Sequence, residues 1–149
     1  MQKGFTIIEL LLVIAMISLI SALSVSFYAR FITQNAVANT QDQLVGDFRK
    51  AQIYAMEGKL YSNWGVNFVS STIVLYQGSS YATRNSALDE NFSVNSNISI
   101  SAMSDVNYAR MTGVPTNGGS AVTTLTITIT GPNSTTKTVT MNSFGVVSK

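Results

Sequence analysis

The sequence contains no cysteine and no histidine, and charged residues make up only 11% of its 149 residues. Without cysteine there can be no disulfide and no thiol nucleophile, and without histidine there can be no Ser–His triad. The seven Asp and Glu residues form no paired-acid or metal-loop pattern. We therefore expect neither an enzyme nor a bound cofactor or metal, and the Ser, Thr and Asn that replace charge are typical of an exported β-rich protein.

Helix-breaking residues are scarce in the first third of the chain. The first proline is Pro115, and no glycine occurs between Gly4 and Gly46. Since proline and glycine are the strongest interruptions of local structure, their absence predicts one continuous helix over residues 5–57, with Gly58 at its end. Such a helix would be roughly 80 Å long, far longer than the average helix of a globular protein.

Charge is also absent from residues 10–29, a run of twenty residues. As a helix this run would be about 30 Å long, which matches the hydrocarbon thickness of a bilayer. We expect residues 5–29 to form a membrane-spanning or filament-core helix, preceded by a short basic segment over residues 1–4. Glu9 stands at the start of the run, where a carboxylate is costly in lipid and gives a plain anchor no advantage.

Residues 30–57 carry apolar side chains at spacings of three, four and seven, which is typical of one face of an amphipathic helix. These side chains are Val37, Leu44, Phe48, Ala51 and Ala55. Most of the remaining surface is polar and is formed by Gln34, Asn35, Gln41, Asp42, Arg49 and Lys50. The pattern predicts a helix that packs one face on the rest of the chain.

Residues 58–149 form a head in which short alternating segments are separated by turn signals, which indicates six or seven short, mostly antiparallel strands. We expect strands over residues 63–69, 71–77, 97–103, 106–111, 122–130, 136–142 and 144–148. We expect loop or turn over residues 78–93 and 112–120. The predicted fold class is α+β: a long N-terminal helix packed on a small antiparallel β-sheet head.

The expected core of the head joins the helix to one hairpin. Ile127 and Val139 lie on the apolar faces of two strands that the loop at residues 131–134 connects. We expect Leu44 and Phe48 of the helix to be buried against these strand residues.

Three hypotheses account for residues 1–29. A secretory signal peptide fits the basic head, the apolar core and the small residues SALSVS. It does not fit the length of the apolar run, the acid at position 9, or the helical pattern that continues without a polar spacer. A single-pass anchor fits the length but leaves Glu9 unexplained. The third hypothesis is a resemblance to a known family.

The segment GFTIIELLLVIAMISLI resembles the N-terminus of type IV pilins and of the pseudopilins of type II secretion. In that family a short basic leader ends in glycine, Phe-Thr follows, and a glutamate stands five residues into the mature chain before a long apolar helix. Gly4, Phe5, Thr6 and Glu9 match these positions. The rest of the chain is similar, more weakly, to the H-type minor pseudopilins and the FimT-type minor pilins, in which an N-terminal helix leads into a β-rich head.

The resemblance implies that a prepilin peptidase cleaves between Gly4 and Phe5 and methylates the new amino group of Phe5. It assigns Glu9 and Thr6 to assembly, with the Glu9 carboxylate pairing with the cationic Phe5 amine of a neighbouring subunit. An unpaired charge is costly where the dielectric constant is low, so this pair would fix the docking register. The implied partners are the peptidase, other pilin or pseudopilin subunits and the inner-membrane assembly platform.

The implied function is structural: a pilin-like subunit of a type IV pilus or related pseudopilus, with a head pattern that favours a minor subunit. It would stay in the inner membrane, with its head outside the cytoplasm, until it joins an extracellular or periplasmic filament. A major pilin, an adhesin and a DNA-binding minor pilin for DNA uptake remain alternatives. Nucleic-acid binding has weak support, because the related DNA-binding pilins use a basic C-terminal tail and this chain ends GVVSK, with one lysine.

The chain departs from many major pilins in two respects. Its apolar segment has neither a proline nor a glycine, so a melted stretch of helix in the filament is not indicated, and it has no cysteine to close a C-terminal loop. The strands must therefore hold the head together. Asp89 and Glu90 offer calcium ligands, but a solvated acidic turn is the favoured interpretation.

Overall fold

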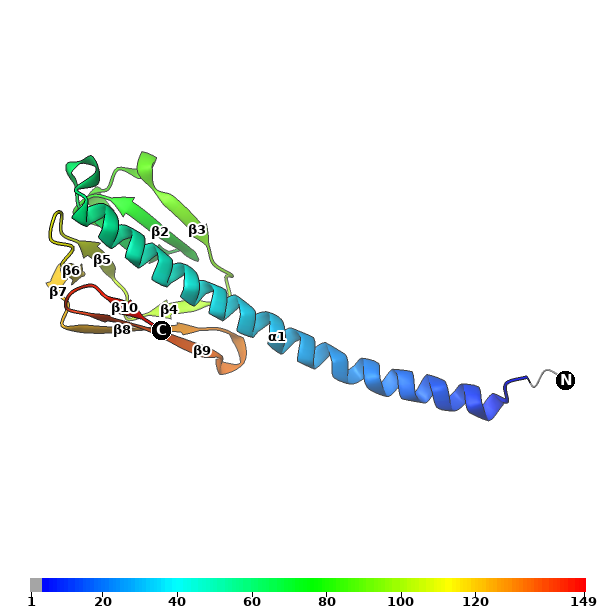
Figure 1. The fold of residues 1–149 in the computed structure, drawn as a ribbon. Helices are drawn as coiled ribbons and strands as arrows, with labels where there is room; N and C mark the ends of the chain where they lie inside the picture. Colours follow the sequence, from blue (N-terminus) through cyan, green and yellow to red (C-terminus); the bar gives the residue numbers. More distant parts are fainter. Residues whose placement is uncertain (1–3) are drawn as a thin grey trace.

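The computed structural model describes residues 4–149, and for residues 23–26 it describes the backbone alone. Most of the expected leader, residues 1–3, lies outside the described residues. A single long helix, α1 (Ile7–Met56), projects as a rod from a β-rich head (Figure 1). The predicted α+β fold class is confirmed.

The ends of α1 lie close to the predicted ones. The helix of 50 residues, about 75 Å long, begins after Thr6 and ends at Met56. Gly58 follows in the left-handed conformation, with φ 63° and ψ 27°, which glycine adopts without steric cost and which commonly ends helices. Its amide donates to the carbonyl of Ala55 at 3.0 Å. The lack of an early breaker thus produces one uninterrupted helix.

Within the described residues the head has ten strands in two antiparallel sheets, more than the six or seven predicted. The six-stranded sheet has the order β3-β2-β1-β5-β6-β7, formed by β1 (Trp64–Val69), β2 (Thr72–Gln77), β3 (Glu90–Ser93), β5 (Asp105–Tyr108), β6 (Pro115–Asn117) and β7 (Ser120–Ala121). The four-stranded sheet has the order β10-β9-β8-β4, formed by β4 (Ser99–Ser101), β8 (Thr124–Thr130), β9 (Thr136–Asn142) and β10 (Val147–Ser148).

Both clearly signalled hairpins form as predicted. Ser70 and Ser71 connect β1 to β2 with φ of 48° and 57°, and two residues with positive φ give the turn that suits the twist of a two-residue hairpin. β8 and β9 form the second hairpin, in which Ile127 lies opposite Val139.

Two segments expected to be loop or turn contain strands instead. β3 pairs with the edge of β2, because Phe92 packs against the core and Glu90 forms an ion pair with Lys50 of α1. β6 and β7 form a hairpin around Gly118 and Gly119, both of which have positive φ. The glycines form a turn, as predicted, but the residues on either side of them form short strands and not an irregular loop.

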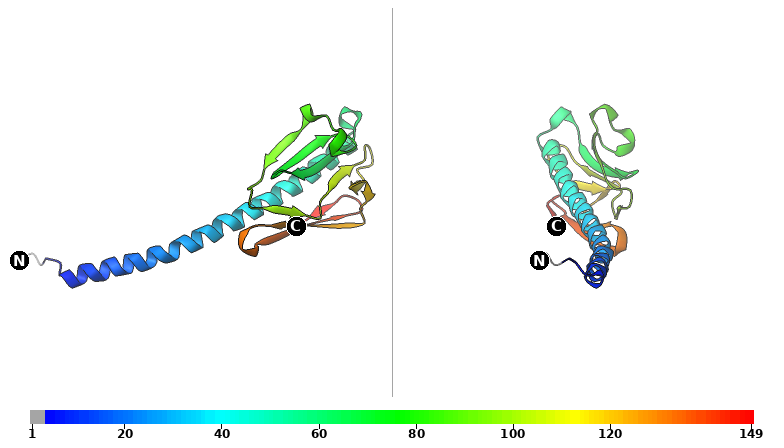
Figure 2. Two further views of the ribbon diagram at one scale, coloured as in Figure 1. Left: turned by 180° about the vertical axis from the view of Figure 1, so that it is seen from behind. Right: turned by 90° about the vertical axis from the view of Figure 1, so that its right-hand side faces the viewer.

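The second half of α1 packs across both sheets, and the first half extends away from them (Figure 2). The apolar stripe is fully buried, with 0% exposure at Val37, Leu44, Phe48, Ala51 and Ala55. Ile127 and Val139 are equally buried and belong to the same core cluster. Burial of a large apolar side chain stabilises a fold by about 1.5–3 kcal/mol, so this stripe is a principal attachment of the head to the rod.

Gln41 does not lie on the polar face where the sequence pattern placed it. Its side chain is buried, and its Nε2 donates to the carbonyl oxygen of Thr138 in β9 at 2.6 Å. A carbonyl that faces a buried helix needs a donor, and the Gln41 amide supplies one.

The turn between β8 and β9 lies against α1 where the rod leaves the head (Figure 1). A Cβ atom on Gly131 would lie 2.5 Å from Cγ2 of Val37, a separation that real Cβ atoms do not show. The glycine therefore allows the turn to approach the helix closely. We call this end of the head its base.

Candidate functional site

The N-terminal turn of α1 is exposed and capped. Gly4 and Phe5 precede the helix, and the Phe5 side chain is 80% exposed. Thr6 is the N-cap: its Oγ1 accepts a hydrogen bond from the amide of Glu9 at 3.3 Å, and its carbonyl accepts one from the amide of Leu10 at 3.2 Å. The Gly4–Phe5 peptide bond therefore lies in accessible chain just outside the first helical turn.

Glu9 is exposed in this first turn. Thr6 and Glu9 have the spacing of a capping box, in which the acid at the third helical position complements the N-cap. A negative charge is also favoured near a helix N-terminus. Sequence reasoning grouped Thr6 with assembly and missed its capping role, although the Thr-x-x-Glu spacing was the available signal.

The N-terminal half of α1 presents a bare apolar surface. Large side chains that are 45–82% exposed cover it: Ile7, Ile8, Leu10, Leu11, Leu12, Val13, Ile14, Met16, Ile17, Leu19, Ile20, Phe27, Tyr28, Phe31 and Ile32. The most apolar window of 18 residues has a mean hydropathy of 2.6, and none of it is buried. Soluble monomers rarely expose an apolar surface of this extent, and its length and composition suffice to cross a membrane.

Polar groups within this surface are partly satisfied by the helix itself. The hydroxyl of Ser18 donates to the carbonyl of Ile14 at 2.8 Å. Such back-bonding removes a free donor from a side chain that would otherwise be unpaired in hydrocarbon.

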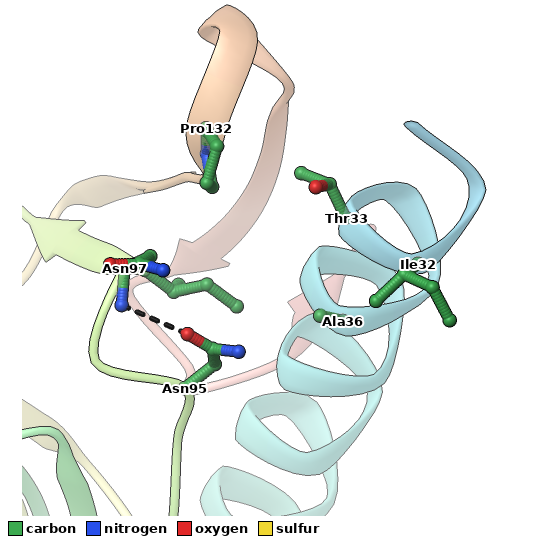
Figure 3. Close-up of a pocket in the computed structure, with 7 residues that line it drawn as sticks. Ile32, Thr33, Ala36, Asn95, Asn97 and Pro132 are labelled. Carbon is green, nitrogen blue, oxygen red and sulfur yellow. Dashed lines mark hydrogen bonds between the residues drawn. The ribbon is translucent and has the colours of Figure 1, made fainter. Parts of the chain in front are cut away.

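Two hollows lie at the base of the head, next to the β8–β9 turn. The first, of about 160 Å³, is lined by Ile32, Thr33, Ala36, Asn95, Asn97, Ile98 and Pro132. Figure 3 shows Thr33 and Ala36 of α1 on one side of it and Pro132 with the two asparagines on the other. The second hollow, of about 210 Å³, is polar and is lined by Arg30, Gln34, Asn133 and Thr135.

Asp47 is a buried acid that sequence reasoning missed. It lies on α1 beside the apolar stripe and is 9% exposed, and the Gln43 amide donates to both of its carboxylate oxygens. Burial raises the pKa of Asp47 to about 6, although the hydrogen bond from Gln43 and the charge of Lys50 oppose the rise. The available signal was its spacing, three residues after Leu44 and four before Ala51, which places it on the buried face of the helix.

Asp89 and Glu90 are both engaged by cations of the protein. Asp89 Oδ2 accepts a hydrogen bond from Arg84 Nε at 2.8 Å, and Glu90 forms an ion pair with Lys50. Within residues 4–149, no group of three or more acids, histidines or cysteines is arranged to hold a metal ion.

Comparisons with known proteins fit this arrangement. Residues 1–25 match the family model of the prokaryotic N-terminal methylation motif. Two type IV major fimbrial proteins FimA of Dichelobacter nodosus are each 28% identical to the chain over 90 residues, which is 60% of this chain and 56% or 57% of theirs. The chain thus matches a little over half the length of these relatives. No solved structure matches it.

A methylation motif that opens a long apolar helix, followed by a β-rich head, defines the pilin-like class of proteins. The methylation motif and the similarity to the two fimbrial proteins support the type IV pilin superfamily for this chain.

Proposed function

We propose that the protein is a structural, non-catalytic subunit of a type IV pilus or related pseudopilus. One observation carries the proposal: an accessible Gly4–Phe5 bond stands directly before a helix whose apolar first half makes no use of the head for burial. That apolar surface would contact lipid while the subunit is held in the membrane and the helices of neighbouring subunits in the filament. A prepilin peptidase would remove residues 1–4 and methylate Phe5, and the inner-membrane platform would transfer the subunit into the filament.

Glu9 supplies the specificity of that transfer. Its exposed carboxylate lies at the end of the apolar surface, where lipid offers no partner. The amine of Phe5 on a neighbouring subunit is a cation at the matching level. An uncompensated charge in a low-dielectric bundle is strongly destabilising. The ion pair between Glu9 and the neighbouring Phe5 amine therefore favours the one axial register in which both charges are paired.

Intact-mass measurement tests the processing step. The protein is produced in cells with and without a prepilin peptidase and purified from the membrane. We expect the peptidase to yield a chain that begins at methylated Phe5, and its absence to leave residues 1–4 in place. A product that begins near Val25 would instead show cleavage by an ordinary signal peptidase and would overturn the proposal.

The abundance of the subunit is tested separately. The matched relatives are named major fimbrial proteins, whereas the head pattern favours a minor subunit. Quantitative mass spectrometry of sheared filaments distinguishes the two. We expect this chain to be a small fraction of the pilin present; if it is the predominant protein, it is a major pilin.

A further inference from the structure

Arg30 is the first charged residue after the apolar run. Residues 10–29 contain no charge, and as part of α1 they extend about 30 Å, the hydrocarbon thickness of a bilayer. In the membrane-held state of the proposed function, Arg30 therefore lies at the depth of the lipid headgroups on the side of the head. No hydrogen bond or ion pair engages its guanidinium among the residues that the structure describes.

The polar hollow at the base of the head is built around this arginine. Arg30 and Gln34 are four residues apart, so they share one face of α1. Asn133 and Thr135 come from the β8–β9 turn, which Gly131 allows to lie close to the helix. The four side chains offer a guanidinium, two amides and a hydroxyl, and none is a carboxylate. This is the donor set of a site for a phosphate group, which guanidinium binds in bidentate fashion.

The surroundings favour a phosphate that carries an apolar body. Phe31 and Ile32 next to Arg30 are 60% and 46% exposed, and the neighbouring hollow on another face of α1 is of mixed character, with Ala36, Ile98 and Pro132 beside Thr33 and two asparagines. Apolar surface at this depth contacts the glycerol and upper acyl region of a lipid. A free phosphate ion would use none of it.

We propose that the hollow formed by Arg30, Gln34, Asn133 and Thr135 binds the phosphate of an anionic phospholipid while the subunit is held in the membrane. The site would fix the depth and rotation of the rod before assembly, because it joins the helix and the head at one lipid. The inference rests on the membrane-held state of the proposed function and goes beyond it by assigning a ligand class to the base of the head.

The test uses the full chain in micelles of a neutral detergent, titrated with phosphatidylglycerol, and native mass spectrometry counts the lipids retained per chain. We expect Arg30→Gln to weaken retention about fivefold, the effect of one basic residue at a lipid surface, and Arg30→Lys to weaken it less. Arg110→Gln is the matched control, since Arg110 is exposed beyond the far end of α1 and contacts the carbonyl of Tyr61; it should retain lipid like the parent.

A second arm adds inorganic phosphate at millimolar concentration to the same samples. We expect it to leave phosphatidylglycerol bound. The proposal would be overturned if Arg30→Gln retained as much lipid as the parent, or if Arg30→Gln and Arg110→Gln lost lipid equally. Displacement of the lipid by phosphate would also overturn it, because the site would then bind the free ion. The lipid titration does not depend on removal of residues 1–4. A chain that the peptidase leaves uncleaved would therefore contradict the proposed function, whereas the lipid site is judged by the titration alone.

Discussion

The amide of Gln43 donates to both carboxylate oxygens of Asp47, at 2.9 and 3.1 Å, across one turn of α1. Lys50 on the same helix and Glu90 on β3 are the charged groups whose fields act on this acid. The pair lies where the helix meets the head, with Asp47 only 9% exposed. A single carboxylate at this contact makes the stability of the head depend on pH.

Burial raises the pKa of Asp47 from 3.8 to about 6. Between these values the folded chain keeps a proton that the unfolded chain has lost, so this group lowers the stability as the pH rises through that window. Asp47→Asn stays neutral and keeps an oxygen for Gln43. We expect it to unfold with the same free energy as the parent near pH 3, below both pKa values, and to be more stable by about 1–3 kcal/mol at pH 7.

Urea unfolding of the full chain in micelles measures this difference. Trp64 is the single tryptophan and is 2% exposed, so its fluorescence reports on the head. Asp42→Asn is the matched control, because Asp42 is exposed on the same helix and pairs with Lys149. An unchanged pH dependence in Asp47→Asn would show that the acid is not the source of the effect.

Phe48→Ala tests the attachment of the helix to the head. Phe48 is fully buried in the core cluster, so its truncation should cost about 3–5 kcal/mol. Ile53→Ala on the same helix, where Ile53 is 49% exposed, should cost less than about 1 kcal/mol. The same fluorescence assay compares the two, and a loss below 1 kcal/mol at Phe48 would mean that this face contacts solvent or a neighbouring subunit instead.

Glu9→Ala separates assembly from membrane insertion. Removal of a charge that is costly in lipid should leave insertion at least as efficient, whereas the neighbour's Phe5 amine loses its partner and incorporation into filaments should fall. Glu9→Leu should behave alike, since the charge and not the size matters. Glu57→Ala, at the other end of α1, is the control. Membrane-fraction and sheared-filament abundance are compared in one strain, and parental filament levels in Glu9→Ala would refute the ion-pair account.

Thr6→Ala tests the cap. The Glu9 amide loses its acceptor, and loss of an N-cap costs about 1 kcal/mol, so hydrogen exchange at this amide should accelerate about fivefold. Thr6→Ser keeps the hydroxyl and should exchange at the parental rate. NMR exchange rates of the full chain in micelles provide the measurement. Similar rates in all three proteins would show that Thr6 does not cap the helix.

The long helix and its buried stripe were predictable because they depend on local rules: no proline or glycine between Gly4 and Gly46, and apolar residues such as Leu44 and Phe48 at helical spacing. The fold class followed from the same rules. β3 was not predictable, since its pairing depends on β2 and on the distant contact between Glu90 and Lys50. The approach of Gly131 to Val37 leaves no local pattern, because it arises from tertiary packing.

That approach has a mechanical consequence. The β8–β9 turn rests directly on α1, with no side chain on Gly131 to separate them, and the same continuous helix runs on through the head. The helix and the head therefore move together as one rigid body. A tilt of about 10° moves the far end of a rod of about 75 Å sideways by roughly 13 Å, so a small change in the angle of the apolar half would sweep the head across a distance larger than the diameter of a helix.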